Sequence, residues 1–151
     1  MAKVLYTAEA TVTGGRIKGH GRTTDGALEV DLRIPVELGG EGGGTNPEQL
    51  FAVGFASCFE SALAAVSRRQ KVAADDAVID SKVSLLPNDA RGFDLAVELD
   101  VTLPSIDDAT VAAEVVRAAH KVCPYSNATR GNIDVTLTAN GQPVEDQSNP
   151  A

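Results

Sequence analysis

Residues 46–71 read NPEQLFAVGFASCFESALAAVSRRQK and have the features of one long helix. Asn46 can cap this helix, Pro47 suits its first turn, and Glu48 complements the positive end of the helix dipole. Apolar side chains recur at helical spacing along one stripe, which consists of Phe51, Phe55, Cys58, Phe59, Ala62 and Val66. No residue between Glu48 and Glu60 is charged. We therefore expect the helix to lie in the middle of the protein, covered in part by a second subunit.

The segments on both sides of this helix have the patterns of strands and of one further helix. The expected strands cover residues 3–12, 27–36, 78–86, 93–103 and 132–139. Asp25-Gly26 is a hairpin signal within a glycine-rich stretch, and Asp107-Asp108 opens a second helix that Pro124 ends. We predict a single α+β domain over residues 1–151 with the element order βββ-α-ββ-α-β. The polar residues 140–151 are expected to form a frayed tail.

Composition and charge exclude several classes of function. The chain has 151 residues, and 13 basic against 21 acidic side chains give a formal net charge of −8. This balance argues against nucleic acid or an anionic membrane surface as partner. The N-terminal stretch lacks the apolar core of a signal peptide, and we found no apolar run of the roughly 20 residues that a membrane span needs. We expect a soluble cytoplasmic protein.

Two cysteines, Cys58 and Cys123, are the first candidates for chemistry. Each also has a plain interpretation, Cys58 as a small buried apolar residue and Cys123 as an incidental thiol in a polar turn. A structural disulfide between them is a further alternative. Neither a zinc site nor a thioredoxin-type dithiol is expected, because paired metal-ligand spacings and a CxxC motif are both missing. His120 could pair with a cysteine, but its place at a helix end favours a solvated cation.

Two stretches, NPEQLFAVGFASCFESAL and VCPYSNATRGNIDVTL, resemble the organic hydroperoxide resistance (Ohr) branch of the Ohr/OsmC family. The resemblance extends from the first expected strand to residue 139, and the CPYSNATRGN run is the more specific part. It implies antiparallel sheets around a long central helix in an intertwined homodimer. It also implies a cysteine-based peroxidase that acts on organic hydroperoxides without a cofactor and is recycled by a dithiol, expected to be a lipoylated protein.

The same resemblance assigns roles to four residues. Cys58 matches the peroxidatic cysteine, and Cys123 matches the resolving cysteine. Arg16 matches the arginine that faces the reactive thiolate, and Glu48 matches the carboxylate that orients this arginine. A second arginine, Arg22, lies nearby, and the preceding Gly-Gly pair favours Arg16.

Physical chemistry is consistent with these roles and raises one geometric question. Only a thiolate attacks a peroxide, and burial would raise the pKa of Cys58, so a cation such as Arg16 is needed beside it. Glu48 and Cys58 are ten residues apart, which is about 15 Å along a straight helix. Either the helix bends near Gly54, or Glu48 acts on the site of the partner chain; we favour the second arrangement.

The phenylalanine stripe has both a structural and a functional interpretation. Phe51, Phe55 and Phe59 can be ordinary core residues or an apolar wall for the organic part of a substrate, and we expect Phe55 and Phe59 to contribute most to such a wall. An OsmC-like peroxidase with different substrate preference, or a cysteine redox sensor or binding protein, remains an alternative function.

Overall fold

The computed structural model describes residues 2–146, and the chain divides into two compact units, residues 1–50 and 51–151. The elements follow the order βββ-α-ββ-αα-ββ, with one short 3₁₀ helix, Val36–Leu38, before the first α-helix. The predicted α+β class is confirmed, with two sheets and one long helix between them along the chain. The prediction of a single domain stays a prediction.

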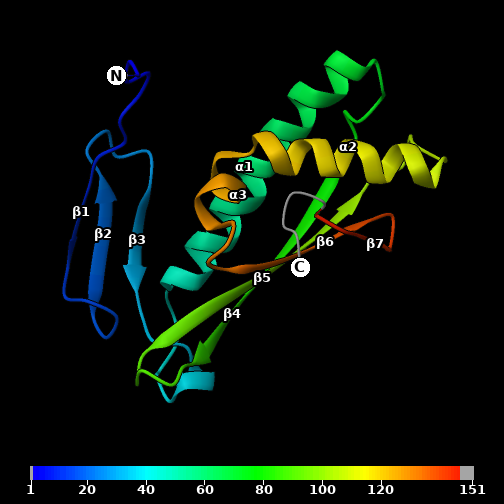
Figure 1. The fold of residues 1–151 in the computed structure, drawn as a ribbon. Coiled ribbons are helices and arrows are strands. Elements are labelled where there is room, and N and C mark those ends of the chain that lie inside the picture. The colour runs from blue at the N-terminus through cyan, green and yellow to red at the C-terminus, as the bar shows by residue number, and fades with distance from the viewer. Residues whose placement is uncertain (1, 147–151) are drawn as a thin grey trace. The chain divides into compact units, whose positions relative to one another are not determined.

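The first unit holds a three-stranded antiparallel sheet with the order β1-β2-β3 (Figure 1). Its strands are β1 (Ala10–Thr13), β2 (Gly19–Thr23) and β3 (Glu29–Leu32). The expected strand over residues 3–12 is therefore largely wrong, since the observed strand β1 covers only positions 10–13. Val4, Leu5 and Tyr6 have strand propensity but are 73–93% exposed, because they pair with no strand of this chain within the described residues. The expected strand over 27–36 is shortened to four residues.

Strand β2 lies in the glycine-rich stretch between the two expected strand ranges, and with it the predicted order of three strands before the long helix is confirmed. Glycine is required at position 19, because a Cβ there would come within 1.9 Å of the Gly15 carbonyl oxygen. Gly14 and Gly15 both have positive φ, of 75° and 60°, and form the turn that leads from β1 to β2. These three glycines allow the tight hairpin that carries Arg16 at its tip.

The long helix α1 runs from Pro47 to Gln70, as the sequence predicted to within one residue. The Asn46 side chain accepts a hydrogen bond of 2.9 Å from the backbone N–H of Gln49, which confirms the predicted cap. By length and composition alone α1 is apolar enough to span a bilayer, contrary to the expectation above. A core helix meets the same criterion, and Phe55, Phe59, Leu63 and Val66 are buried against the rest of the second unit.

The second unit holds a four-stranded sheet with the order β4-β5-β6-β7. Its strands are β4 (Val78–Pro87), β5 (Phe93–Thr102), β6 (Asp134–Ala139) and β7 (Gln142–Val144). Strands β5 and β6 are parallel, which corrects the expectation of antiparallel sheets. The chain between them forms α2 (Ala109–Val122) and α3 (Pro124–Thr129), and such a helical crossover returns a strand in the same direction.

The expected frayed tail is wrong for the part that the structure describes. β7 pairs antiparallel with β6, and Val144 is buried in the core. Asn140 and Gly141 have φ values of 49° and 80°, so this Asn-Gly pair forms the tight turn of a hairpin. Residues 147–151 lie outside the described residues.

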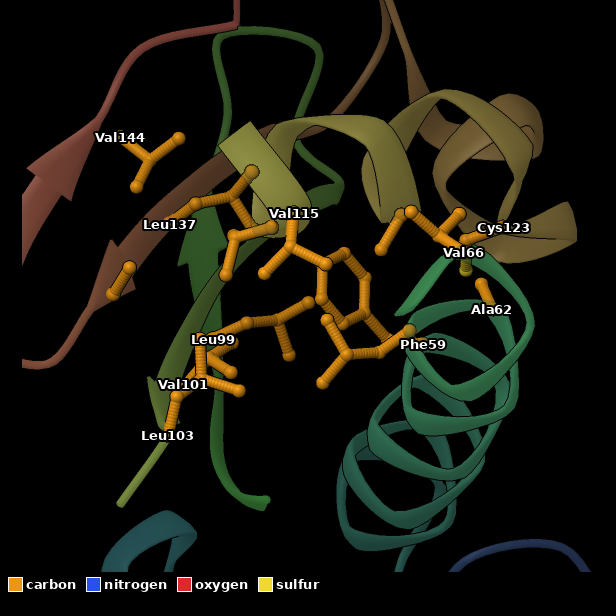
Figure 2. Close-up of a cluster of buried hydrophobic side chains, with 14 of the residues drawn as sticks. Phe59, Ala62, Val66, Leu99, Val101, Leu103, Val115, Cys123, Leu137 and Val144 are labelled. Atoms are coloured by element: carbon orange, nitrogen blue, oxygen red, sulfur yellow. The ribbon is translucent and has the colours of Figure 1, made fainter. Parts of the chain in front are cut away.

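The core of this unit forms where α1 and α2 meet the sheet. Figure 2 shows Phe59, Ala62 and Val66 of α1 directed into a cluster that also holds side chains from β5, α2 and β6. Val115 and Val116 on the inner face of α2 are fully buried. Cys123, at the end of α2, belongs to the same cluster. One of the two candidate cysteines is thereby built into the core.

Candidate functional site

Arg16 and Glu48 form a two-point ion pair within the first unit. Arg16 Nη1 donates to Glu48 Oε2 at 3.2 Å, and Nη2 donates to Oε1 at 2.9 Å. The glycine hairpin presents Arg16, and the first turn of α1 presents Glu48. The hydrogen bonds from Arg16 hold the pKa of Glu48 below its ordinary value. The arginine side chain is nearly half exposed, so part of its surface is available to another group.

Cys58 and Cys123 meet within the second unit, although 65 positions separate them in the sequence. Both thiols are free; Cys58 is half-buried on α1, and Cys123 is fully buried between α2 and α3. The Cys123 side chain lies close enough to Cys58 to raise the pKa of the Cys58 thiol. The predicted pair of thiols is thus brought together without being bridged.

Cys58 opens onto a shallow hollow of about 570 Å³. The lining comes from one side of α1 and from the junction of α2 and α3: Gly54, Ser57, Cys58, Ser61, Ala62, Ala65, Arg69, Val122, Pro124 and Tyr125. Small side chains on α1 leave the space open, and Val122 and Tyr125 supply apolar surface that is 43% and 39% exposed. A small molecule with an apolar group could therefore reach the Cys58 sulfur.

The pKa of the Cys58 thiol is raised above its ordinary value, chiefly by burial. The backbone N–H of Tyr125 favours the thiolate and so acts in the opposite direction, whereas the Cys123 side chain raises the pKa further. Thiolate formation at neutral pH therefore needs an additional positive group.

Cys123 has a structural role of its own at the junction of two helices. Its backbone N–H ends α2 with a 2.9 Å hydrogen bond to the Ala119 carbonyl, and its sulfur accepts from the backbone N–H of Ser126 at 3.5 Å. The sulfur thus caps α3, a helix that replaces the turn we expected at this position. The Pro124 that follows suits the first turn of a helix, a signal that was present in the sequence.

Tyr125 is a site residue that the sequence analysis missed. Its ring contacts those of Phe51 and Phe55, with centroids 6.0 and 5.7 Å apart. A Cβ at position 54 would come within 3.2 Å of its hydroxyl oxygen, so Gly54 gives the ring its room. The two residues are 71 positions apart, and no local pattern could have indicated this contact.

The three phenylalanines lie in or against the core, which is one of the two roles expected for them. Phe55 and Phe59 are fully buried in the core, Phe51 is partly buried, and none of the three lines the hollow in the described chain. In this structure the exposed aromatic surface beside Cys58 belongs to Tyr125. A role for the phenylalanines as a substrate wall stays a prediction.

His120 is not the solvated cation that its place at a helix end suggested. It is only 3% exposed and lies between Ser126 and Asp146, at 2.8 and 3.0 Å from its two ring nitrogens. Burial lowers its pKa, in spite of the nearby Asp146 carboxylate. Among residues 2–146, no cluster of three or more histidine, cysteine or carboxylate side chains is arranged to hold a metal ion.

Comparisons with known proteins give consistent matches. A family model described as OsmC-like protein matches residues 39–138. The organic hydroperoxide resistance protein of Xanthomonas axonopodis pv. citri (strain 306) is 54% identical over 140 residues, which are 90% of this chain and 95% of that protein. The organic hydroperoxide resistance protein OhrB of Bacillus subtilis (strain 168) is 45% identical over 134 residues, covering 88% and 96%.

A solved structure gives the same result for the fold. The crystal structure of an organic hydroperoxide resistance protein OsmC from Legionella pneumophila matches with a TM-score of 0.85 and 52% identity. The match covers 89% of this chain and 97% of that one. Sequence and fold therefore agree over nearly the whole length of both proteins.

Proposed function

The chain belongs to the OsmC-like protein family and, within it, to the organic hydroperoxide resistance proteins; from this premise we propose that it is a cysteine-based peroxidase that reduces organic hydroperoxides to alcohols. The observation that carries the proposal is the meeting of two free thiols, one half-exposed on an open hollow and the other buried beside it. A reactive thiol must be reached by peroxide, and a resolving thiol must lie close enough to condense with its product.

The reaction begins with the thiolate of Cys58. This thiolate attacks the terminal oxygen of ROOH, the O–O bond breaks, and the alkoxide leaves as ROH after taking up a proton, so that Cys58 becomes a sulfenic acid. The Cys123 thiol then attacks the Cys58 sulfur, which forms a disulfide and releases water. An external dithiol reduces the disulfide by thiol exchange; following the family resemblance, we propose a lipoylated protein as this reductant.

Arg16 and Glu48 complete the proposed site. Glu48 accepts two hydrogen bonds from one side of the Arg16 guanidinium and leaves further N–H donors free to face a reacting group. A guanidinium beside Cys58 would offset the burial that raises the thiol pKa, and its donors could stabilise charge on the departing oxygen. An arginine serves both purposes because it does not lose its proton.

We further propose that two copies of the chain form the working protein in the cytoplasm. Val53 on α1 is 71% exposed, and Leu5 and Tyr6 near the N-terminus are 93% and 80% exposed, although all three are large apolar side chains. A second copy would cover such surface. Free reactive thiols suit a reducing compartment. Sedimentation of the purified protein tests the dimer directly.

Substitution of each cysteine tests the proposed reaction. Cys58→Ser should abolish peroxide consumption, whereas Cys123→Ser should allow one oxidation of Cys58 and then stall or proceed to overoxidation. Steady-state assays should compare an aryl or alkyl hydroperoxide with hydrogen peroxide, and dihydrolipoamide with thioredoxin as donor. Equal residual turnover in the two variants would contradict the assignment. A preference for hydrogen peroxide would favour an OsmC-like activity, and absence of turnover would favour a sensor or binding protein.

A further inference from the structure

A buried chain of polar groups ends at the sulfur of Cys123. Asp146 Oδ2 lies 3.0 Å from His120 Nε2, and His120 Nδ1 lies 2.8 Å from the hydroxyl of Ser126. The backbone N–H of Ser126 then donates to Cys123 Sγ at 3.5 Å. All four residues belong to the second unit and come from the end of α2, its junction with α3, the start of α3 and the irregular segment after β7.

The direction of these hydrogen bonds follows from the chemistry of the groups. An ionised carboxylate only accepts, so His120 donates from Nε2 to Asp146. The neutral ring then has its lone pair at Nδ1, which accepts the hydroxyl proton of Ser126. Burial favours this neutral ring by lowering the pKa of His120. The carboxylate therefore fixes the tautomer, and the tautomer fixes the Ser126 hydroxyl.

Arg130 contacts this row of hydrogen-bonded groups without being a member of it. Its Nη2 donates to the His120 carbonyl at 2.7 Å, its Nη1 donates to Asn127 at 2.8 Å, and its Nε lies 3.5 Å from Asp146 Oδ2. The segment after β7 is thereby tied to the helix junction that holds Cys123. The positions of this segment and of the junction are coupled by charge-assisted contacts rather than by packing alone.

An aspartate, a histidine and a serine in this order resemble the components of a hydrolase, but Ser126 is fully buried. No substrate reaches its hydroxyl in the described chain, so the arrangement is suited to positioning rather than to nucleophilic attack. The group that links this arrangement to the reacting thiols is the backbone N–H of Ser126, which donates to the sulfur of Cys123.

We propose that His120, oriented by Asp146, is a positioning residue for the resolving step: it fixes Ser126, whose backbone N–H holds the Cys123 sulfur in place for attack on the oxidised Cys58. This inference rests on the proposed peroxidase function. The step that it governs is condensation of the Cys123 thiol with the Cys58 sulfenic acid, which forms one S–S bond and releases one water. Attack of the Cys58 thiolate on the organic hydroperoxide precedes it and does not use His120.

Two substitutions of His120 separate its contact with Asp146 from its contact with Ser126. A glutamine amide can occupy the Nε2 position and keep the contact with Asp146, whereas an asparagine amide can occupy the Nδ1 position and keep the contact with Ser126. His120→Gln should therefore slow disulfide formation about tenfold, since small misplacements of reacting groups cost this much or more. His120→Asn should slow it less. Asp146→Asn should have an intermediate effect, and Asp134→Asn, an exposed carboxylate beside the same segment, serves as its control.

The experiment mixes the full-length reduced protein with one equivalent of an aryl hydroperoxide. Sulfenic acid is trapped with a dimedone reagent, disulfide is counted from remaining thiols, and the melting temperature of each variant is recorded. The proposal is supported if sulfenic acid forms at an unchanged rate while disulfide formation is slowed most in His120→Gln, less in Asp146→Asn and least in His120→Asn. Equal resolving rates in all variants overturn it and leave the peroxidase function standing. Slowing of both steps together with a lower melting temperature also overturns it, because a general loss of structure then explains the effect. Absence of sulfenic acid in the unsubstituted protein rejects the peroxidase function itself.

Discussion

Arg16 and Glu48 bind each other through two hydrogen bonds between different atom pairs, at 2.9 and 3.2 Å, which fix the plane of the guanidinium as well as its position. A single contact would leave the arginine free to rotate about one bond. The pair is partly exposed, so its contribution to stability is expected to be below about 1 kcal/mol. Its importance should therefore lie in orientation, and its removal should affect activity more than folding.

Glu48→Gln tests this expectation. The amide can accept from only one side of the guanidinium, so Arg16 loses its fixed plane and Cys58 should react with organic hydroperoxide about tenfold more slowly. The melting temperature should change by no more than a few degrees. Rapid-mixing kinetics and thermal unfolding give the two measurements, and Glu41→Gln, an exposed carboxylate of the same unit, is the control. A large loss of stability with normal reactivity would show that the pair is structural.

The pH dependence of Cys58 tests the role of Arg16. Burial raises the pKa of this thiol, so the reactive thiolate forms only as the pH rises toward that pKa, and a neighbouring cation lowers the pH at which it forms. Arg16→Gln should therefore shift the midpoint of the rate–pH profile to higher pH. Ultraviolet absorbance of the thiolate in a Cys123→Ser background isolates Cys58. Arg22→Gln is the matched control, and a shift in that variant instead would transfer the role to Arg22.

Gly54→Ala tests whether Tyr125 forms part of the substrate site. The added methyl would lie 3.2 and 3.3 Å from the hydroxyl oxygen and Cε2 of Tyr125, so the ring must move. We expect KM for an aryl hydroperoxide to rise severalfold, with a smaller effect for hydrogen peroxide, which needs no apolar surface. Gly92→Ala is the control, because its Cβ would meet only the Asn88 side chain at an ordinary 3.4 Å. Equal changes for both peroxides would remove Tyr125 from substrate recognition.

Local patterns predicted the elements whose signals lie within a few residues of one another. Asn46, Pro47 and the apolar stripe predicted α1, and the strand pattern over residues 93–103 predicted β5, in which Val97, Leu99 and Val101 are buried. The hairpin of β6 and β7 also has a local signal in Asn140-Gly141, although the polar composition of residues 140–151 favoured the interpretation as a frayed tail.

The remaining features depend on contacts between distant segments. The parallel pairing of β5 with β6 depends on the path of the α2–α3 crossover, which no strand pattern contains. His120 was predicted to be solvated because the sequence shows its helix end but not the approach of Asp146, 26 residues later. The family resemblance, rather than any spacing, indicated that Cys58 and Cys123 belong together. The structure adds their neighbours Gly54, Ser126 and Tyr125.

Mixed dimers test which chain supplies Glu48 to each proposed site. Glu48 and Cys58 lie ten residues apart on one unbroken helix, about 15 Å along its axis, so a single arginine does not easily serve both on the same chain. If Glu48 of each chain acts at Cys58 of the other chain, a dimer of one Cys58→Ser chain and one Glu48→Ala chain places both defects in one site. The other site stays intact, and such dimers should retain about half of the unsubstituted activity if the sites are independent.

The same-chain arrangement gives a different result from the same dimers. Each site then carries one defect, so activity should fall well below half and approach that of one Glu48→Ala site. The heterodimers can be purified with two different affinity tags, and both parent homodimers measured alongside provide the reference rates. Sedimentation must show that the heterodimer persists during the assay, because exchange of subunits would average the two cases. Activity no higher than half that of the Glu48→Ala homodimer would rule out exchange of Glu48 between chains. A bend of α1 near Gly54, the other arrangement considered for a same-chain site, would then be the one to test.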